Sequence, residues 1–462
     1  MRFSQHYLGC LSHASYLVAD ELSKRAVVVD PQRDVSAYLM EASSRGLTIT
    51  HVVETHFHAD FVSGHLELAA ETGAEICYGA AAGETSFPTR LLSDGERLAL
   101  GDGDDGVVLE VWETPGHTPE SISLLVYEHA NDDVPYGVLT GDTLFIGDVG
   151  RPDLLASVGV TADDLARRLY ASTRRLLTLP DEVRVFPAHG AGSACGKNLS
   201  TETESTIGEQ RRSNYALQDL DEDEFVRLVT EGQSVAPLYF SFDAQRNRET
   251  RALLDETTPP PALTMDEVLK LQADGAIVVD TRDPQEFAAG HLRGSRNVGL
   301  GGRFAEYAGD VIRPDDRVVL VGEPGTETEG MVRLARIGFD VVVGHLDKPY
   351  RTFLARPDLV VSSSHVTAAQ LDEARSSTPG LVVVDVRNPG EIEASGAIPG
   401  ARSIPLARLL ASLDELDPAA PTVVHCAGGY RSSIAASVLA SAGFTDVSDL
   451  VGGYDAWAAT AS

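Results

Sequence analysis

Two histidines and an aspartate lie within five residues of one another, directly after an apolar run of the chain. The stretch reads Thr55-His56-Phe57-His58-Ala59-Asp60-Phe61, and the run before it, residues 49–53, has the length and character of a short buried strand. Histidine nitrogens and carboxylate oxygens are ligands for borderline and hard metal ions. A solvated loop is the alternative interpretation, so a metal site requires further ligands elsewhere in a matching pattern.

The same succession of an apolar strand and a polar ligand recurs three more times. The further strands and the ligands that follow them are residues 107–112 with His117, residues 138–140 with Asp142, and residues 184–186 with His189. Loops that leave the strands of a rigid sheet can aim several side chains at one point. The pattern therefore predicts an α/β domain with a metal site on its strand-end loops. A helix is expected over residues 61–72, ending at Gly73.

Three of these ligands form a set of their own: His56, His117 and Asp142. Two histidines and one carboxylate with open coordination positions are the ligands of non-haem Fe(II) oxygenases. We therefore expect one Fe(II) per chain at this site, with zinc as an alternative ion in purified protein. Open positions allow O2 and a substrate sulfur to bind side by side.

The charge of the chain limits its partners. The 462 residues carry a net charge of -32 and only four lysines. Such a surface repels nucleic acid and anionic lipid, so neither is an expected partner. No apolar stretch is long enough for a membrane span, and the first ten residues do not resemble a signal peptide. The four cysteines are far apart, which favours free thiols in a cytoplasmic protein.

The C-terminal half contains an internal duplication. The motif around Asp280 recurs 105 residues later around Asp385, and Gly338-Phe339 recurs at Gly443-Phe444 with the same offset. A period of this length indicates duplicated domains, each a small parallel α/β unit. The three consecutive prolines at 259–261 indicate a semi-rigid linker before the first copy. We place the domains at residues 1–253, 264–360 and 361–462, with a Pro-rich linker at 254–263.

Cys426 follows an apolar strand and precedes a helix predicted over residues 431–442. A cysteine at a helix N-terminus is surrounded by backbone N–H groups, and Arg431 lies five residues further along the chain. Both features favour thiolate over thiol. We expect an accessible thiolate that accepts a sulfur atom as a persulfide; an inert buried cysteine is the alternative. Cys10 and Cys77 are expected in the core, and Cys195 at the substrate entrance or in a structural role.

The motifs THFHAD, TPGHT, GDTLF and FPAHG, which begin at Thr55, Thr114, Gly141 and Phe186, together resemble the metallo-β-lactamase fold. The resemblance covers the predicted first domain and implies an αββα sandwich. Within that superfamily it is nearest to persulfide dioxygenases, which implies that His56, His117 and Asp142 hold iron.

The chain departs from the hydrolase branch of this superfamily at one position. Hydrolases such as glyoxalase II have HxHxDH and two metals, whereas this chain has Phe61 at the last position of the motif. A phenyl ring cannot bind a metal, so we expect one ion. His58, Asp60 and His189 are then expected to orient the ligands and to hydrogen-bond bound water or substrate. His65 is expected either at the site or on a helix surface.

The segment from Cys426 to Arg431 resembles the active-site loop of rhodaneses, and it is one residue shorter than the loop of related phosphatases. The shorter loop favours sulfur transfer, with Cys426 as the nucleophile and Arg431 binding the anionic sulfur species. Asp385 and Arg387 are expected to be structural. The middle copy has Val321 in place of the cysteine. We interpret it as a catalytically inactive rhodanese-like domain that spaces the other domains or supports a homo-oligomer.

The sequence thus predicts an α/β protein, with an N-terminal metallo-β-lactamase αββα sandwich followed by two small rhodanese-like parallel α/β domains. Its expected activity is oxidation of a low-molecular-weight thiol persulfide by O2 to sulfite and thiol, coupled to sulfane-sulfur transfer involving thiosulfate at Cys426. Two alternatives stay open: a glyoxalase II-like thioester hydrolase fused to a sulfurtransferase, and a non-catalytic sulfur carrier or sensor.

Overall fold

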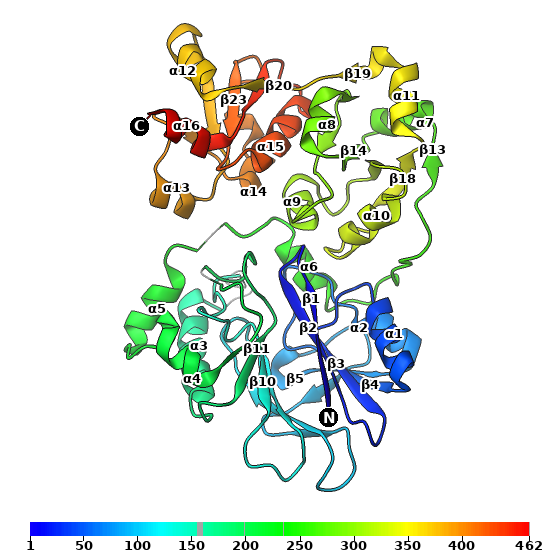
Figure 1. The fold of residues 1–462 in the computed structure, drawn as a ribbon, viewed down its shortest axis with the longest axis vertical. Helices are drawn as coiled ribbons and strands as arrows, with labels where there is room; N and C mark the ends of the chain where they lie inside the picture. Colours follow the sequence, from blue (N-terminus) through cyan, green and yellow to red (C-terminus); the bar gives the residue numbers. More distant parts are fainter. Residues whose placement is uncertain (155–159, 198, 234, 462) are drawn as a thin grey trace. The chain divides into compact units, whose positions relative to one another are not determined.

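The computed structural model describes residues 1–154, 160–197, 199–233 and 235–461. Its contacts divide the chain into two compact units (Figure 1). The first comprises Met1–Gln233 and Phe240–Leu254, and the second comprises Ser234–Tyr239 and Asp255–Ser462. Among the residues that the structure describes, no helix combines the length and the apolar character needed to cross a membrane.

The first unit contains two six-stranded sheets. The first sheet has the spatial order β1 (Arg2–Leu8), β2 (His13–Ala19), β3 (Arg25–Val29), β4 (Thr48–Val53), β5 (Glu75–Gly79) and β6 (Arg90–Leu92). The second sheet has the order β12 (Ser205–Thr206), β11 (Arg184–Pro187), β10 (Gly137–Gly141), β9 (Ile122–Tyr127), β8 (Val108–Glu113) and β7 (Arg97–Ala99). The four strands that the sequence places before the ligand motifs are β4, β8, β10 and β11, and all four are confirmed.

Alternation along the strands separates the core of this unit into layers. On β3, Val27 and Val29 face a core shared by both sheets, whereas Ala26 and Val28 face a core on the outer side of the first sheet. This period of two is the geometry of a strand covered on both faces. The unit is therefore an αββα sandwich, as predicted.

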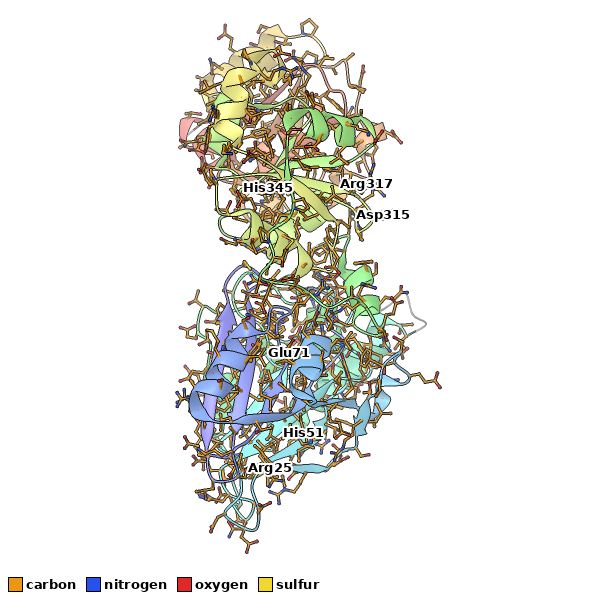
Figure 2. The ribbon with its side chains drawn as sticks, turned by 90° about the vertical axis from the view of Figure 1, so that its right-hand side faces the viewer. Arg25, His51, Glu71, Asp315, Arg317 and His345 are labelled. Carbon is orange, nitrogen blue, oxygen red and sulfur yellow. The ribbon has the colours of Figure 1, made fainter. Side chains whose placement is uncertain are left out.

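The outer faces of the two sheets are covered by helices. Helix α1 (Ser36–Arg45) and helix α2 (His65–Thr72) pack on the first sheet, and α3 (Ala162–Leu176) and α5 (Glu222–Thr230) pack on the second. Figure 2 shows α2, on which Glu71 is labelled. The unit also contains α4 (Ile207–Ser213) and α6 (Phe240–Arg246).

The helix predicted over residues 61–72 begins four residues later than expected, at His65. Residues before it are held in a non-helical path by Asn247, whose Nδ2 donates to the carbonyl oxygens of His58 (2.9 Å) and Phe61 (2.8 Å). The Ser63 N–H in turn donates to Asn247 Oδ1 at 2.8 Å. The prediction was wrong here because a distant side chain satisfies the backbone groups that a helix would otherwise use.

The second unit contains two parallel sheets with the same topology. One has the order β13 (Ala262–Leu263), β18 (Val342–Leu346), β17 (Val318–Val321), β14 (Ile277–Asp280) and β16 (Arg296–Asn297). The other has the order β20 (Ser364–Val366), β24 (Val447–Leu450), β23 (Thr422–His425), β21 (Val382–Asp385) and β22 (Arg402–Ser403). β15 (His291–Leu292) pairs separately with β19 (Val360–Val361). The duplication seen in the sequence is thus present in the strand order.

Ten helices of the second unit alternate with these strands among the described residues. In the first copy they are α7 (Met265–Ala273), α8 (Pro284–Ala289), α9 (Phe304–Val311), α10 (Glu327–Ala335) and α11 (Pro349–Ala355). In the second copy they are α12 (Ala368–Ser377), α13 (Pro389–Ser395), α14 (Leu406–Leu409), α15 (Tyr430–Ser441) and α16 (Gly453–Ala461). The α/β alternation is that of two small parallel domains.

Part of the predicted linker is ordered structure. Ala262 and Leu263 form β13, which pairs with β18 at His345 and Leu346. The Pro260 carbonyl oxygen also lies 2.9 Å from Nδ1 of His345, which is labelled in Figure 2. The end of the Pro-rich stretch is therefore fastened to the sheet that follows it.

Candidate metal centre and cysteine loop

His56, His117 and Asp142 are brought together from the ends of β4, β8 and β10. Their potential ligand atoms all lie within 4.8 Å of one another. Nε2 of His117 is 3.4 Å and Nε2 of His56 is 3.7 Å from Asp142 Oδ2. All three side chains are buried, so this is a preformed site that a metal ion fits.

Hydrogen bonds on the far side of each histidine ring aim its Nε2 atom at this site. His117 Nδ1 lies 2.9 Å from the Arg151 carbonyl oxygen and therefore donates its proton there. Thr55 Oγ1 donates to Asp30 Oδ2, so it accepts from His56 Nδ1 at 3.0 Å. Nδ1 protonation leaves Nε2 as the lone-pair atom in both rings.

Two of the atoms that face the site have no hydrogen-bond partner among the described residues. These buried, unpartnered atoms include Nε2 of His56 and Oδ2 of Asp142. Unpartnered buried polar atoms are costly, and a bound cation satisfies them. Burial and the neighbouring histidines lower the pKa of His56 well below its usual value. Burial likewise lowers the pKa of His117. Both rings are thus neutral, the form that binds metals.

His189 joins Asp142 to Asp60. Its Nδ1 lies 2.7 Å from Asp142 Oδ1, and its Nε2 lies 2.7 Å from Asp60 Oδ2. Burial alone would lower the pKa of His189, but the two carboxylates raise it well above its usual value. Although burial raises the pKa of Asp60, the contact with His189 outweighs it and lowers that pKa to about 2. A hydrogen bond to Asp142 and an ion pair with Asp60 thus join the three buried side chains and hold the Asp142 carboxylate in place.

Cys195 also lies in this neighbourhood. The sequence pattern did not decide between its two possible roles. Asp60, His189 and Cys195 form a second group whose potential ligand atoms lie within 4.8 Å of one another. The thiol is 1% exposed, and burial together with Asp60 raises its pKa well above its usual value. Its nearness to His189 in sequence was the only signal of this position. Cys77 is in the core as predicted, whereas Cys10 is half-buried.

His58 points to a different set of groups. Its Nε2 is 3.1 Å from Asp30 Oδ1 and 3.5 Å from Glu54 Oε2. Burial and the charge of Asp30 raise the pKa of Glu54 to about 8. His65 begins α2, is fully buried, and lies 3.4 Å from Glu54 Oε1, so it is neither on the helix surface nor in the metal group.

The C-terminal copy presents Cys426 at the end of β23, immediately before α15. The Gly429 N–H donates to Cys426 Sγ at 3.1 Å, and Ser432 Oγ is 3.7 Å from the same sulfur. Cys426 is only 2% exposed, which is less than the predicted accessible thiolate requires. Arg431 pairs with both oxygens of Glu391 at 2.6 and 2.7 Å, and that charge raises its pKa.

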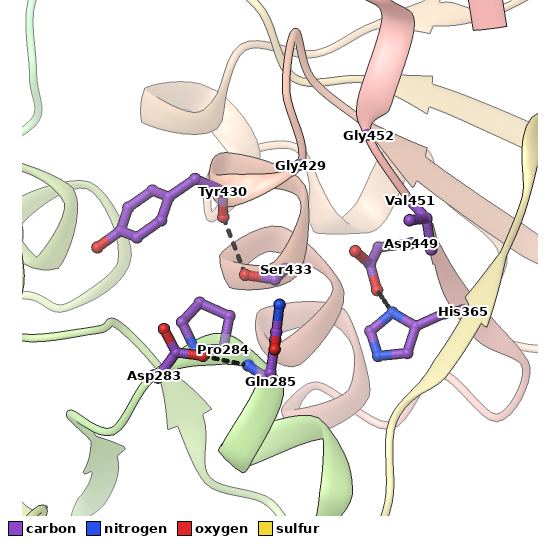
Figure 3. Close-up of a pocket in the computed structure, with 10 residues that line it drawn as sticks. All are labelled: Asp283, Pro284, Gln285, His365, Gly429, Tyr430, Ser433, Asp449, Val451 and Gly452. Atoms are coloured by element: carbon purple, nitrogen blue, oxygen red, sulfur yellow. Dashed lines mark hydrogen bonds and ion pairs between the residues drawn. The ribbon is translucent and has the colours of Figure 1, made fainter. Parts of the chain in front are cut away.

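The copy without the cysteine contacts the loop of Cys426. Tyr430 Oη donates to the Gly299 carbonyl oxygen at 2.9 Å. Ser437 Oγ of α15 accepts the Asn297 N–H at 2.9 Å, and Ser441 Oγ accepts from Arg296 Nε at 3.1 Å. A cavity of about 480 Å³ lies beside the loop; its lining includes Gln285, Ser433 and the His365–Asp449 ion pair of 2.5 Å (Figure 3).

Comparison with known proteins agrees with this architecture. A family model described as Metallo-beta-lactamase superfamily matches residues 8–189, and one described as Rhodanese-like domain matches residues 264–355 and 367–460. The crystal structure of a metallo-beta-lactamase from Staphylococcus aureus subsp. aureus COL is 32% identical with a TM-score of 0.67, covering 74% of this chain and 98% of that one. The chain belongs to the metallo-beta-lactamase superfamily and carries two rhodanese-like domains.

The curated relatives each match less than half of this chain. A Beta-lactamase hydrolase-like protein of Xylella fastidiosa is 28% identical over 257 residues, 49% of this chain and 55% of that protein, so the chain spans about half of its length. The mitochondrial persulfide dioxygenase ETHE1 of Homo sapiens is 29% identical over 223 residues, 46% of this chain and 75% of that protein. A Hydroxyacylglutathione hydrolase of Rhodospirillum rubrum is 33% identical over 187 residues, 40% of this chain and 65% of that protein.

Proposed function

We propose that the first unit oxidises a low-molecular-weight thiol persulfide with O2 at a single Fe(II), and that the C-terminal copy transfers sulfane sulfur through Cys426. The observation that carries this proposal is the preformed group of His56, His117 and Asp142, with Phe61 in place of a further ligand. In the overall oxidation, one persulfide, one O2 and one water give one thiol, one sulfite and two protons. Bound ferrous iron would supply the redox chemistry that joins dioxygen to sulfur.

The protein's own residues hold and shield this site. Nε2 of His56, Nε2 of His117 and Oδ2 of Asp142 would bind the ion, since these atoms lie close together and two of them, His56 Nε2 and Asp142 Oδ2, have no hydrogen-bond partner among the described residues. The contact of His189 with Asp142 Oδ1 leaves only Oδ2 for the metal. Complete burial of these side chains excludes bulk water, which strengthens each of these interactions.

At the C-terminal loop, the Cys426 thiolate would attack the outer sulfur of thiosulfate, forming a cysteine persulfide and releasing sulfite. An acceptor thiolate would then remove that sulfur and regenerate the Cys426 thiolate. The Gly429 N–H stabilises negative charge on Sγ. Because Arg431 is paired with Glu391, its role is to fix that side of the loop and to lend it positive charge. Thiosulfate, sulfite, persulfide and O2 are the proposed small-molecule partners.

The test is oxygen consumption by anaerobically iron-loaded protein supplied with glutathione persulfide, with sulfite measured in parallel. Oxygen uptake matched by sulfite, lost in His117→Ala and kept in Cys426→Ser, is the expected result. Thiosulfate:thiol sulfurtransferase activity is expected to show the reverse dependence on these two variants. Absence of uptake with fully iron-loaded protein and several persulfides would overturn the dioxygenase. Thioester cleavage would then favour the hydrolase alternative.

A further inference from the structure

Helix α15 begins directly after the loop of Cys426 and has no side-chain cap at its N-terminus. Its N-cap residue is Gly429, whose φ of +109° is a left-handed conformation that glycine adopts without strain. The Gly429 N–H donates to Cys426 Sγ at 3.1 Å, so the start of the helix is also part of the sulfur site. A capping side chain usually fixes the start of a helix. Because glycine has no side chain, this helix needs support from another part of the chain.

One face of α15 is hydrogen-bonded to the middle copy. Tyr430, Ser437 and Ser441 are spaced by seven and four residues, which places them on the same side of a helix. All three side chains bond to residues 296–299 of the middle copy, at 2.9–3.1 Å. Since α15 runs from Tyr430 to Ser441, the helix is attached to this short segment from its first residue to its last.

The segment that holds α15 is itself fixed in the middle copy. Asn297 Nδ2 donates to the carbonyl oxygens of Asp280 and Arg282, at 3.0 Å each. Asn297 belongs to β16 and is completely buried. In the C-terminal copy the equivalent edge strand is β22, and both of its residues are exposed. The edge of the sheet is therefore covered in the middle copy, where α15 lies against it, and uncovered in the C-terminal copy.

Tyr430 connects this attachment to the sulfur site. It directly follows Gly429, and its ring lies 5.5 Å from that of Tyr307 on α9 of the middle copy, between ring centroids. The next residue, Arg431, pairs with Glu391 of the C-terminal copy. The start of α15 is thus held on one side by its own copy and on the other side by the middle copy.

We propose that the middle copy is a positioning domain for Cys426. Its segment 296–299, acting through Tyr430, holds the start of α15 so that the Gly429 N–H stays within hydrogen-bond distance of the sulfur. An N–H donor stabilises a thiolate more than a thiol, so its exact position controls how readily the nucleophile forms. Tyr430 is a positioning residue because it acts through Gly429. The inference rests on the proposed function for the reaction that Cys426 performs.

A titration of the Cys426 thiolate tests this role without any sulfur transfer. The ultraviolet absorbance of the thiolate is followed against pH in full-length protein, and the spectrum of the matching Cys426→Ser protein is subtracted. We expect Tyr430→Phe, which removes one hydroxyl, to move the titration to higher pH by about half a unit, equivalent to about threefold. Tyr430→Ala, which also removes the ring, should move it further. Unfolded molecules would add a separate step where a free thiol titrates, which distinguishes misfolding from mispositioning.

The matched control is Tyr350→Phe. It also removes a tyrosine hydroxyl from the second unit, one that bonds to Glu286 Oε2 of the middle copy at 2.8 Å. This variant should titrate like wild type, because Tyr350 is on α11 and its hydroxyl does not bond to α15.

Sulfurtransferase kinetics give the second measurement. Below the wild-type titration midpoint, Tyr430→Phe should lower kcat about twofold and leave KM for thiosulfate unchanged, because the nucleophile is affected and the anion site is not. Unchanged titrations in both Tyr430 variants would overturn the inference while leaving sulfur transfer intact. A shifted titration in protein that transfers no sulfur from thiosulfate would support the positioning role and reject the proposed transfer.

Discussion

The ring of Phe61 packs against two histidines of the first unit. Its centroid is 4.1 Å from that of His13 and 4.3 Å from that of His58. A histidine at this position could reach the same neighbourhood with a nitrogen, but a phenyl ring adds only apolar bulk. We therefore expect the side chain at position 61 to influence how many ions this neighbourhood holds.

Phe61→His is expected to raise the zinc bound by the protein from about one to about two ions per chain, because it adds a nitrogen beside Asp60, His189 and Cys195. Elemental analysis after dialysis against excess zinc measures this ratio. Phe61→Leu is the matched control and should stay at the wild-type ratio. A wild-type protein that already holds two ions would show that Cys195 completes the second site without the added histidine.

Residue-scale prediction succeeded where ligands follow strands and failed where partners come from distant parts of the chain. The structure brings His56, His117 and Asp142 together as the motif spacing suggested. No local pattern marks Asn247, which lies in a polar stretch just before the predicted linker. Its role depends on contacts with residues more than 150 positions earlier, which a reading of local periodicity does not capture.

At the scale of elements, the loop between β4 and α2 depends on Asn247. This side chain makes three buried hydrogen bonds to the backbone of that loop. Asn247→Ala is expected to lower the free energy of unfolding by about 3 kcal/mol, since each buried backbone group loses a partner. Urea denaturation measures this free energy of unfolding. A Trp457→Phe background leaves Trp112 as the fluorescence reporter. The exposed substitution Gln245→Ala on α6 should change stability little; equal effects of the two would contradict the proposed clamp.

The β15–β19 pair makes the second unit sensitive to acid. Burial lowers the pKa of His291 to about 4, and its ring stacks on Phe287 at 3.7 Å. Because the unfolded chain binds this proton at its ordinary pKa, His291 favours unfolding once the pH falls below about 6.5. This group should remove about 2–3 kcal/mol of stability between about pH 7 and about pH 4.5.

Urea denaturation followed by Trp457 fluorescence in a Trp112→Phe background tests this pH dependence. His291→Asn should show a smaller loss of stability over the same range. Identical pH dependence in the two proteins would show that His291 is not the titrating group.

Element boundaries were predictable to within about one residue where apolar runs end in Gly, Pro or a ligand motif. Residues 49–53 and 184–186 correspond to β4 and β11, and α2 ends before Gly73, whose φ is +72°. The start of α2 was not predictable, because Gly64 must pass the Gln32 carbonyl oxygen too closely for any larger side chain. The apolar period of the helix can be read from the sequence. The close backbone contact that makes the helix begin later cannot.

The two rhodanese-like copies keep the same internal support. Arg282 pairs with Asp280 at 2.6 Å, and Arg387 pairs with Asp385 at the same distance, both buried. The copies differ where β17 and β23 end: Val321, the last residue of β17, stands in place of the cysteine, and Glu323 follows. The ion pair that supports the fold is therefore present in both copies, whereas the thiol is present in one.

Restoring a thiol to the middle copy is not expected to restore sulfur transfer. The double variant Val321→Cys/Cys426→Ser should lack thiosulfate:thiol sulfurtransferase activity, because Glu323 and Glu327 place negative charge where an anionic donor must approach. Val321→Cys alone should retain wild-type activity through Cys426. Cyanide-dependent release of sulfite from thiosulfate measures the sulfurtransferase activity of both variants. Activity in the double variant would show that only the nucleophile was lost.

The hydrogen bond from Tyr430 to Gly299 joins the loop of Cys426 to the copy that has valine at the corresponding position. As the ribosome releases the chain, the middle copy emerges first and is already available as a surface when the last copy is completed. A gene fragment that encodes only the last copy would lack that surface. We therefore expect the pair of copies, rather than either copy alone, to be the unit that recombination can move, because separating them breaks the contacts between them.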